Sequence, residues 1–232
     1  MLVDIIMPTH NPGIYIGEAI ESCLNQSYRN IRLTVVDDCS ADSLDSLKSK
    51  YPGVNFLRMD KNGGPAAARN FGVKNTNASF ISFLDDDDVM AKDKIYLSLE
   101  EFKKNKNIGM VCGNYQQIID GQIKKPFYPQ PIVINYSNLM RINFVASGSV
   151  TIKREVFDSI GGFNEKYWIA EDYDCWIRTI EVAPIQYIHK VLYYYRINTN
   201  NGSLTQRSDS KLKEAINIKE IKEASIKRLR GK

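Results

Sequence analysis

The 232-residue sequence has few cysteines and no long apolar run. Its four cysteines form no Cys-x-x-Cys pair and are scattered through apolar or mixed segments; they are Cys23, Cys39, Cys112 and Cys175. This pattern argues against a zinc site or a disulfide framework and favours reduced thiols in a cytosolic protein. No stretch approaches the ~18 apolar residues of a membrane span, so we expect a soluble protein.

The first residues do not resemble a secretory signal peptide. The apolar run within Met1–Pro8 is short, contains Asp4 and has no basic region before it. The formal net charge of +4 is modest, and the basic excess lies mainly in the last residues, so we expect no nucleic-acid partner. The length fits one sizeable domain, or a main domain with a small appendage.

Strand-like and helix-like segments alternate through residues 1–104. The predicted strands are Val3–Met7, Ile31–Val36, Val54–Met59 and Phe80–Leu84, and the predicted helices are Ile14–Gln26, Ser43–Lys50, Ala66–Lys74 and Lys92–Lys104. This alternation predicts an α/β fold: a Rossmann-like, mostly parallel sheet with helices on both faces. In such sheets, ligands bind at the carboxyl ends of the strands.

Polar residues follow each of the four predicted strands. The four groups are Pro8–Asn11, Asp37–Ser40, Asp60–Gly64 and Asp85–Asp88. Because the carboxyl ends of parallel strands meet at one edge of the sheet, we expect these groups to converge on a single crevice.

The acidic run Asp85–Asp88 follows an apolar strand directly. Carboxylates this close repel one another and raise each other's pKa unless a cation is present. Hard oxygen ligands suit Mg²⁺ or Mn²⁺, which often bind through one or two carboxylates and substrate phosphates. The run therefore predicts a metal and phosphate site, and the alternative is an acidic turn that caps the next helix.

The second half of the chain is read as a mixed α+β region. We predict strands at Ile108–Ile119, Ser147–Ile152, Ile185–Ile188 and Val191–Arg196, helices at Ser137–Arg141, Arg154–Ser159 and Ala170–Glu181, and a loop at Lys124–Pro131. Residues 206–232 form a basic, helix-prone tail. This tail is either a solvated helix packed on the domain or a contact with an anionic membrane surface.

Six short motifs occur in a characteristic order. They are Ile5–Asn11, Val35–Asp42, Asn62–Asn70, Asp85–Asp88, Gly161–Phe163 and Glu171–Trp176. In this order and spacing the chain resembles the family 2 inverting glycosyltransferases of the GT-A fold, bacterial enzymes that build surface polysaccharides. The resemblance covers roughly residues 1–205. It implies a nucleotide-binding half over about residues 1–104 and an acceptor-binding half over about residues 105–205.

The resemblance also implies a donor site. Asp38 would accept a hydrogen bond from a uracil N–H, because an ionised carboxylate is only an acceptor. Pro8, Thr9 and Asn11 would line the same pocket. Asn62, Gly64 and Arg69 belong to the segment that would close over the ribose and diphosphate. Arg69 could stabilise its helix, pair with an acidic residue near the metal, or reach a phosphate.

Roles for the acidic residues follow from the same resemblance. Asp87 would contact Mn²⁺ or Mg²⁺ directly, and Asp85 would lie beside it, near the ribose or a metal-bound water. Asp86 is placed with the donor-binding residues. The metal would neutralise the charge on the departing nucleoside diphosphate. Asp172 would be the general base, and the alternative is that it only favours the start of its helix.

The chain departs from the family pattern after Arg196, a phosphate candidate. Similar enzymes often have a His two residues after this Arg, and here Asn198 occupies that position. Metal binding would then depend on the aspartates and the nucleotide alone.

We therefore expect a metal-dependent inverting glycosyltransferase that moves a sugar from a UDP-sugar to a hydroxyl of a glycan or lipid-linked acceptor. It would be cytoplasmic, at the inner face of the cell membrane where the basic tail makes contact. One alternative, a nucleotidyltransferase, would need a Gly-rich basic loop after the first strand, but His10–Gly13 has no Lys or Arg. The other alternative is a non-catalytic sugar-nucleotide-binding subunit.

Overall fold

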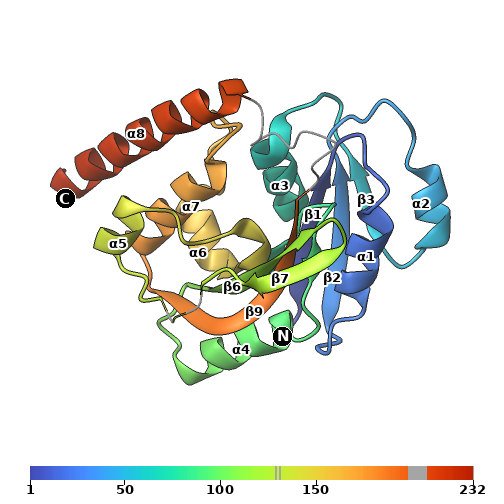
Figure 1. Ribbon diagram of the computed structural model, residues 1–232, viewed down its shortest axis with the longest axis horizontal. Helices are drawn as coiled ribbons and strands as arrows, with labels where there is room; N and C mark the ends of the chain where they lie inside the picture. Colours follow the sequence, from blue (N-terminus) through green and yellow to red (C-terminus); the bar gives the residue numbers. More distant parts are fainter. Residues whose placement is uncertain (129, 131, 198–207, 232) are drawn as a thin grey trace.

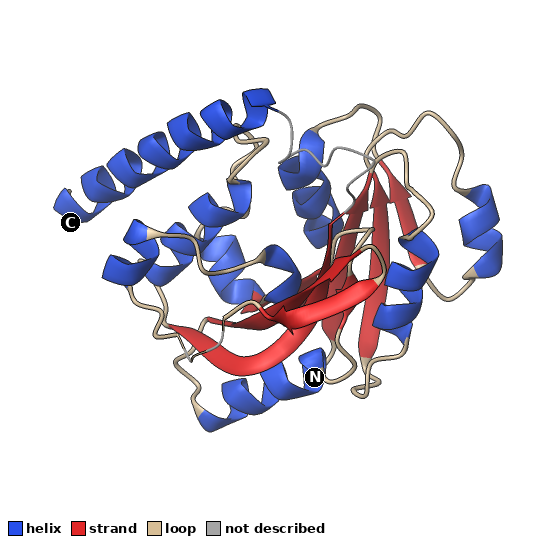
Figure 2. Ribbon diagram, viewed as in Figure 1, coloured by secondary structure: helices blue, strands red, loops and turns tan. Residues whose placement is uncertain are grey.

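The computed structural model describes residues 1–128, 130, 132–197 and 208–231. A strongly twisted sheet forms the centre, and helices lie on both of its faces (Figure 1). Along the sheet the strands follow the order β3-β2-β1-β4-β8-β6-β9-β5, and β7 pairs with the outer part of β6. Figure 2 shows the sheet fanning from a nearly flat half to a curled half.

The flat half is parallel. Its strands are β1 (Val3–Thr9), β2 (Ile31–Asp37), β3 (Asn55–Arg58) and β4 (Phe80–Phe83), joined by helices α1 (Ile16–Leu24), α2 (Asp45–Lys50) and α3 (Gly64–Lys74). Every residue of β1 is buried, as expected for a strand with helices on both sides. The predicted βαβ units are therefore present, and their strands all end at one edge.

The curled half contains both strand directions. Its strands are β5 (Val89–Met90), β6 (Met110–Ile119), β7 (Gln122–Pro126), β8 (Thr151–Lys153) and β9 (Ile185–Ile197). β8 runs antiparallel to both β4 and β6, while β6 and β9 are parallel. Helices α4 (Lys94–Lys104), α5 (Tyr136–Arg141), α6 (Arg154–Ser159) and α7 (Glu171–Ile180) belong to this half.

Three predictions for this half are wrong in detail. The predicted loop at Lys124–Pro131 begins inside β7, which among the described residues is an edge strand paired with β6, a position that tolerates Pro126. The two strands predicted between residues 185 and 196 are one bent strand, whose register against β6 shifts near Asn114. The strand predicted over Ser147–Ile152 begins only at Thr151, as β8, and a 3₁₀ turn occupies Ser147–Ser149.

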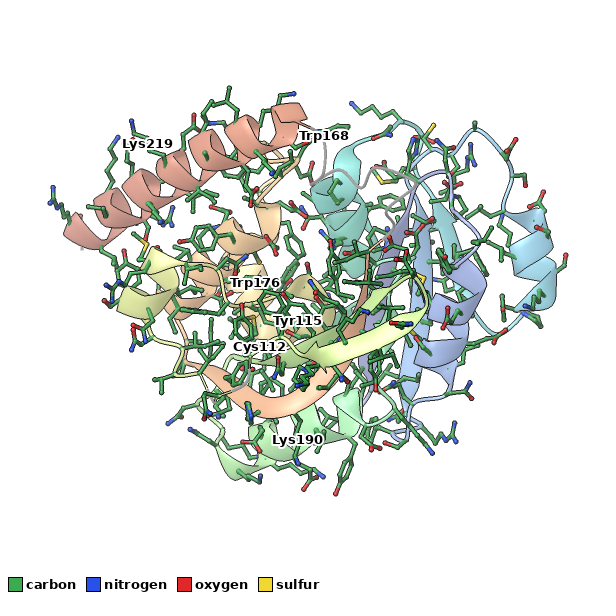
Figure 3. All side chains as sticks on the ribbon, in the orientation of Figure 1. Cys112, Tyr115, Trp168, Trp176, Lys190 and Lys219 are labelled. Carbon is green, nitrogen blue, oxygen red and sulfur yellow. The ribbon has the colours of Figure 1, made fainter. Side chains whose placement is uncertain are left out.

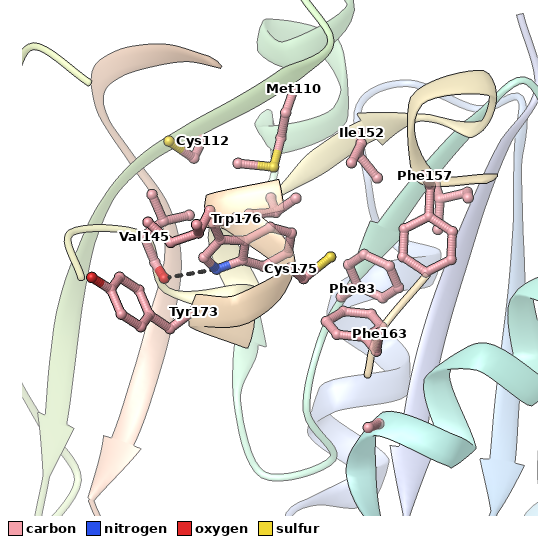
Figure 4. Close-up of a cluster of buried hydrophobic side chains, with 14 of the residues drawn as sticks. Phe83, Met110, Cys112, Val145, Ile152, Phe157, Phe163, Tyr173, Cys175 and Trp176 are labelled. Carbon is pink, nitrogen blue, oxygen red and sulfur yellow. Dashed lines mark hydrogen bonds between the residues drawn. The ribbon is translucent and has the colours of Figure 1, made fainter. Parts of the chain in front are cut away.

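Two apolar layers cover the sheet. Ile5 and Met7 of β1 pack with α1 and α4 on one face, while Ile6 packs with α3, α6 and α7 on the other. Figure 4 shows the second layer around Trp176, which is fully buried and donates from Nε1 to the Val145 carbonyl at 3.1 Å. Trp176 is thus a core residue.

The basic tail contains helix α8 (Ser208–Arg230), which crosses the outside of α7 (Figure 1). Ile221 of α8 is fully buried, and Arg228 makes a two-pronged contact of 2.8 Å with Glu181. In the part of the chain that the structure describes, no helix is long and apolar enough to cross a membrane.

Candidate active site

A cleft of about 660 Å³ lies at the edge where the parallel strands end. This volume is typical of a small-molecule site. Most of the predicted site residues line it: Pro8, Thr9, Asp38, Asn62, Gly64, Arg69, Asp85, Asp86, Asp87 and Asp172. Asn11 and Arg196 are not among the lining residues. Asn198 lies outside the described residues.

Asp38 forms the inner wall at one end of the cleft. Its carboxylate accepts hydrogen bonds from the backbone N–H of Gly63 at 2.7 Å and of Gly64 at 2.8 Å, at the start of α3. The side chain is 4% exposed. Each carboxylate oxygen has more than one acceptor position, so these two bonds leave capacity for a further donor.

His10 was given no role from sequence, yet it connects three loops at this end. Its Nδ1 lies 2.8 Å from the Asp38 carbonyl oxygen, and its Nε2 lies 3.1 Å from the Asn62 amide nitrogen. These partners fit the tautomer that carries its proton on Nδ1. His10 therefore holds the Asp38 loop against the Asn62 loop.

Asn11 supports the same loops from outside the cleft. It has a left-handed backbone with φ of 51°. Its side-chain oxygen accepts from Ala41 N at 2.8 Å, and its own N–H donates to Ser40 Oγ at 2.8 Å. The residue ties the end of β1 to the end of β2.

The acidic run lines the cleft, and its carboxyl groups differ in environment. Asp86 accepts a short hydrogen bond from Thr9 Oγ1. Burial, together with neighbouring aspartates, raises the pKa of Asp86 to about 7 and the pKa of Asp87 to about 6. Asp88 is buried and accepts from Arg196 N at 2.8 Å, and burial holds its pKa well above the ordinary range.

Arg196 lies behind the acidic run. Its Nε donates to the Asp87 carbonyl at 2.8 Å, and its guanidinium pairs with Glu18 at 2.6 Å and covers the Tyr15 ring. The side chain is therefore directed toward α1, where it fixes the backbone that presents Asp87.

The donor set fits a hard divalent cation that is completed by phosphate. Burial of Asp86 and Asp87 makes their negative charges costly, and a nearby cation would relieve this cost. Within residues 1–128, 130, 132–197 and 208–231, no three His, Cys, Asp or Glu side chains are grouped to hold a metal. A cation here would rely on one or two aspartates and on oxygens from a nucleotide.

Arg69 links the acidic run to the start of α7. Its guanidinium is 3% exposed and pairs with Asp85 at 2.6 Å and with Glu171 at 2.7 Å. Of its three predicted roles, pairing with acidic residues is present in the structure, and a contact with phosphate stays a prediction. Glu171 in turn precedes Asp172, whose pKa is raised by burial and by the Glu171 charge.

Sequence comparison identifies the family. Residues 4–161 match the family described as "Glycosyl transferase family 2". The chain belongs to this glycosyltransferase family.

Relatives of the glycosyltransferase include an uncharacterized glycosyltransferase of Haemophilus influenzae, which is 33% identical over 93% of this chain and 85% of the relative. Escherichia coli chondroitin synthase is 29% identical over 88% of this chain and 30% of its own length. The solved structure of S. aureus TarS 1-349 in complex with UDP-GlcNAc has a TM-score of 0.73 and 22% identity, covering 87% of this chain and 60% of that one. The glycosyltransferase thus has the predicted GT-A fold, and it spans less than two thirds of the last two proteins.

Several cleft residues of the glycosyltransferase were not predicted from sequence. Trp168 lines the cleft and is 50% exposed. Tyr115, Tyr193 and Tyr195 form an aromatic wall from β6 and β9. The only sequence signal for this wall was the density of aromatic residues in two strands, which equally suits a core.

Lys94 lies fully buried beneath the acidic run. Its Nζ donates to the carbonyls of Phe83 at 3.0 Å and Gly148 at 2.6 Å, and burial lowers its pKa to about 7. A neutral amine has two N–H groups, which match these two acceptors. Lys94 therefore joins the end of β4 to the 3₁₀ turn in the other half of the sheet.

Proposed function

We propose that this glycosyltransferase moves a sugar from a UDP-sugar to a hydroxyl of a glycan or lipid-linked acceptor in polysaccharide biosynthesis, with inversion at the anomeric carbon. The observation that carries the proposal is the ion-paired bridge Asp85–Arg69–Glu171. It holds the acidic run and the start of α7, with Asp172, against one cleft. A donor diphosphate and an acceptor hydroxyl could then lie on either side of the transferred sugar.

Asp172 is the proposed general base. Its carboxylate takes the proton from the acceptor hydroxyl while the oxygen forms a bond to the anomeric carbon. The bond from that carbon to the diphosphate breaks on the opposite side, and UDP leaves with the bonding electron pair. The raised pKa of Asp172 suits this role, because a stronger base accepts the hydroxyl proton more readily.

Asp87 and Asp85 are the proposed residues for Mn²⁺ or Mg²⁺. When bound, such an ion would neutralise charge that develops on the leaving diphosphate. Arg196 fixes the backbone of Asp87, and Arg69 orients Asp85, so both arginines contribute to the donor site through the aspartates.

Asp38 is the proposed contact for the uracil base. It lines the cleft together with His10 and Asn62, and a uracil N–H would use its remaining acceptor capacity. The likeness to TarS, which was solved with UDP and UDP-GlcNAc, motivates a UDP-linked donor. Pro8, Thr9 and Gly64 also line the cleft and are proposed to contact the nucleotide.

The outer face of α8 is the proposed contact with an anionic membrane. Leu212 is 68% exposed and Ile216 is 50% exposed, one turn apart. The exposed Lys219 and Lys227 share this side of the helix. Apolar side chains flanked by basic ones suit the interface of an anionic bilayer. This contact would place the enzyme at the inner face of the cell membrane, near a lipid-linked acceptor.

The test is UDP release from a panel of UDP-sugars in the presence of Mn²⁺. We expect one sugar to support release. Asp172→Asn should abolish transfer while UDP still binds, and Asp87→Ala should lose metal-dependent UDP binding in calorimetry. Near-normal turnover by Asp172→Asn would show that the base is misassigned. A wild-type chain that binds UDP-sugars but turns none over would instead favour a non-catalytic binding subunit.

A further inference from the structure

The inner face of α8 contacts the loop that leads into α7. Asn217 Nδ2 donates to the Ile169 carbonyl at 2.9 Å, and Glu220 pairs with Lys166 at 2.6 Å. Glu214 and Ile218, which share this helical face with Asn217, line the cleft itself. The helix is therefore one wall of the cleft on the side of Asp172.

The loop held by Asn217 carries strain at the point where it enters α7. Ala170, the residue after Ile169, has a left-handed φ of 65°. This conformation is costly for a residue with a side chain and persists only where surrounding contacts impose it. The next two residues are Glu171 and Asp172. The hydrogen bond from Asn217 thus acts on the peptide that sets the direction of the catalytic turn.

The same loop reaches the donor half of the cleft through Trp168. The indole ring lies over Gly64, so close that a Cβ on Gly64 would stand 3.0 Å from Trp168 Cδ2. Figure 3 shows Trp168 near the start of α8, next to α3. The loop therefore touches the start of α3 with Trp168 and presents Asp172 two residues after the strained position.

The far end of α8 is anchored independently of this loop. Ser225 and Arg228 both bind Glu181, and the Tyr136 hydroxyl lies 2.9 Å from Ser225 Oγ. Ile221 is buried in the core layer that includes α7. With its second half fixed on α7, the helix offers Asn217 as a rigid donor.

We propose that α8 is part of the active site and that Asn217 is a positioning residue for Asp172 and Trp168. Asn217 holds the Ile169–Ala170 peptide in its strained form, which keeps Asp172 in the cleft and Trp168 on Gly64. The inference rests on the proposed function, in which Asp172 is the general base.

The experiment compares Asn217→Asp, Asn217→Ala and the exposed control Lys213→Ala. Asn217→Asp keeps the shape of the side chain but replaces the donor with an oxygen that repels the Ile169 carbonyl. We expect UDP release from the best UDP-sugar of the panel to lose about tenfold or more in kcat, as for a misplaced catalytic group. The donor KM, the Kd for UDP with Mn²⁺ and the melting temperature should stay near those of the control.

A second readout needs no substrate. The chain has two tryptophans, and Trp176 is fully buried while Trp168 is half exposed. Acrylamide quenching of fluorescence therefore reports mainly on Trp168, and Trp168→Phe identifies its share. We expect stronger quenching in both Asn217 variants than in Lys213→Ala. Glu220→Gln, which breaks the second contact with the loop, should change both readouts in the same direction and serves if an Asn217 variant does not fold.

The outcomes separate this inference from the proposed function. If Asp172→Asn is inactive but the Asn217 and Glu220 variants match the control in kcat and quenching, the inference is wrong and the proposed function stands. The inference would also be wrong if the variants that lose kcat have a lower melting temperature and weaker UDP binding than Lys213→Ala. In that case α8 would act only by packing against the rest of the fold. If Asp172→Asn keeps near-normal turnover, the general base is misassigned and the inference, which rests on it, fails, while the glycosyl transfer itself stands.

Discussion

Arg69 and Glu171 form a buried ion pair of 2.7 Å that connects α3 to the first turn of α7. The two residues are 102 positions apart in the chain, and both line the cleft. Arg69 also pairs with Asp85, so one guanidinium neutralises carboxylates of the acidic run and of the first turn of α7. The spacing of the two halves of the site depends on this cation.

Replacement of Arg69 by Met should therefore destabilise the protein strongly. Glu171 is buried and would lose its cation, and breaking such a pair from one side costs about 3–5 kcal/mol. Urea denaturation measures the change. The matched control is Arg29→Met, at an exposed arginine, which should change the unfolding free energy by less than about 0.5 kcal/mol. Equal stability of the two variants would show that Arg69 is not needed to hold the halves together.

Gly64→Ala should be destabilising for two separate reasons. Gly64 has φ of +82°, which costs a residue with a side chain about 1–2 kcal/mol, and its new methyl group would press on Trp168. We expect a loss of at least that amount in urea denaturation, with weaker UDP binding. Gly13→Ala is the control, because nothing lies within 4 Å of a Cβ there. A Gly64→Ala protein as stable as the control would mean that neither the left-handed backbone of Gly64 nor its contact with Trp168 exists in solution.

The flat half of the sheet and most of the cleft were predictable from sequence. Period and turn signals located β1 to β4, and the rule for parallel strands then brought Thr9, Asp38 and Asp85–Asp88 together. These features depend on local patterns and on one general rule of topology. Asp172 was predicted from the order of the motifs. No local pattern distinguishes it from an acidic residue that only favours the start of a helix.

Features that depend on contacts distant in sequence were not predictable. The short strand β5 is defined only by its pairing with Tyr193 and Tyr194 of β9. A pattern of residues does not show that the Arg196 side chain pairs with Glu18 and covers the Tyr15 ring. Helix α8 has only a weak apolar stripe, so helical periodicity did not show which of its faces packs on the fold. The contact of Asn217 with Ile169 could therefore not be predicted.

In the presence of a chelator, Asp87→Asn should stabilise the protein at pH 8. Burial raises the pKa of Asp87 to about 6, above its ordinary value of 3.8. Between these values the native state binds more protons than the unfolded state, so stability falls as pH rises through this window. The loss of stability persists at pH values above the pKa of Asp87 in the folded protein, and the neutral amide of Asn removes this loss. We expect a gain of about 1–2 kcal/mol at pH 8 that shrinks as the pH is lowered toward 4.

Thermal unfolding with and without Mn²⁺ plus UDP tests this prediction. The added ligands should stabilise the wild type more than Asp87→Asn and so reverse their order, because binding to the native state adds to stability. Asp42→Asn, at an exposed aspartate outside the cleft, should match the wild type in both conditions. A lower melting temperature for Asp87→Asn than for the wild type in chelator would show that the negative charge of Asp87 does not destabilise the folded protein.

The pH dependence of turnover should report on Asp172. A general base works only when deprotonated, so kcat/KM for UDP release should rise with pH through the pKa of this group. Burial and the Glu171 charge raise that pKa, while Arg69 lowers it. Glu171→Gln removes the neighbouring negative charge and should therefore move the midpoint to lower pH. The exposed substitution Glu155→Gln should leave it unchanged. A midpoint that moves to higher pH in Glu171→Gln would mean that the titrating base is a group other than Asp172.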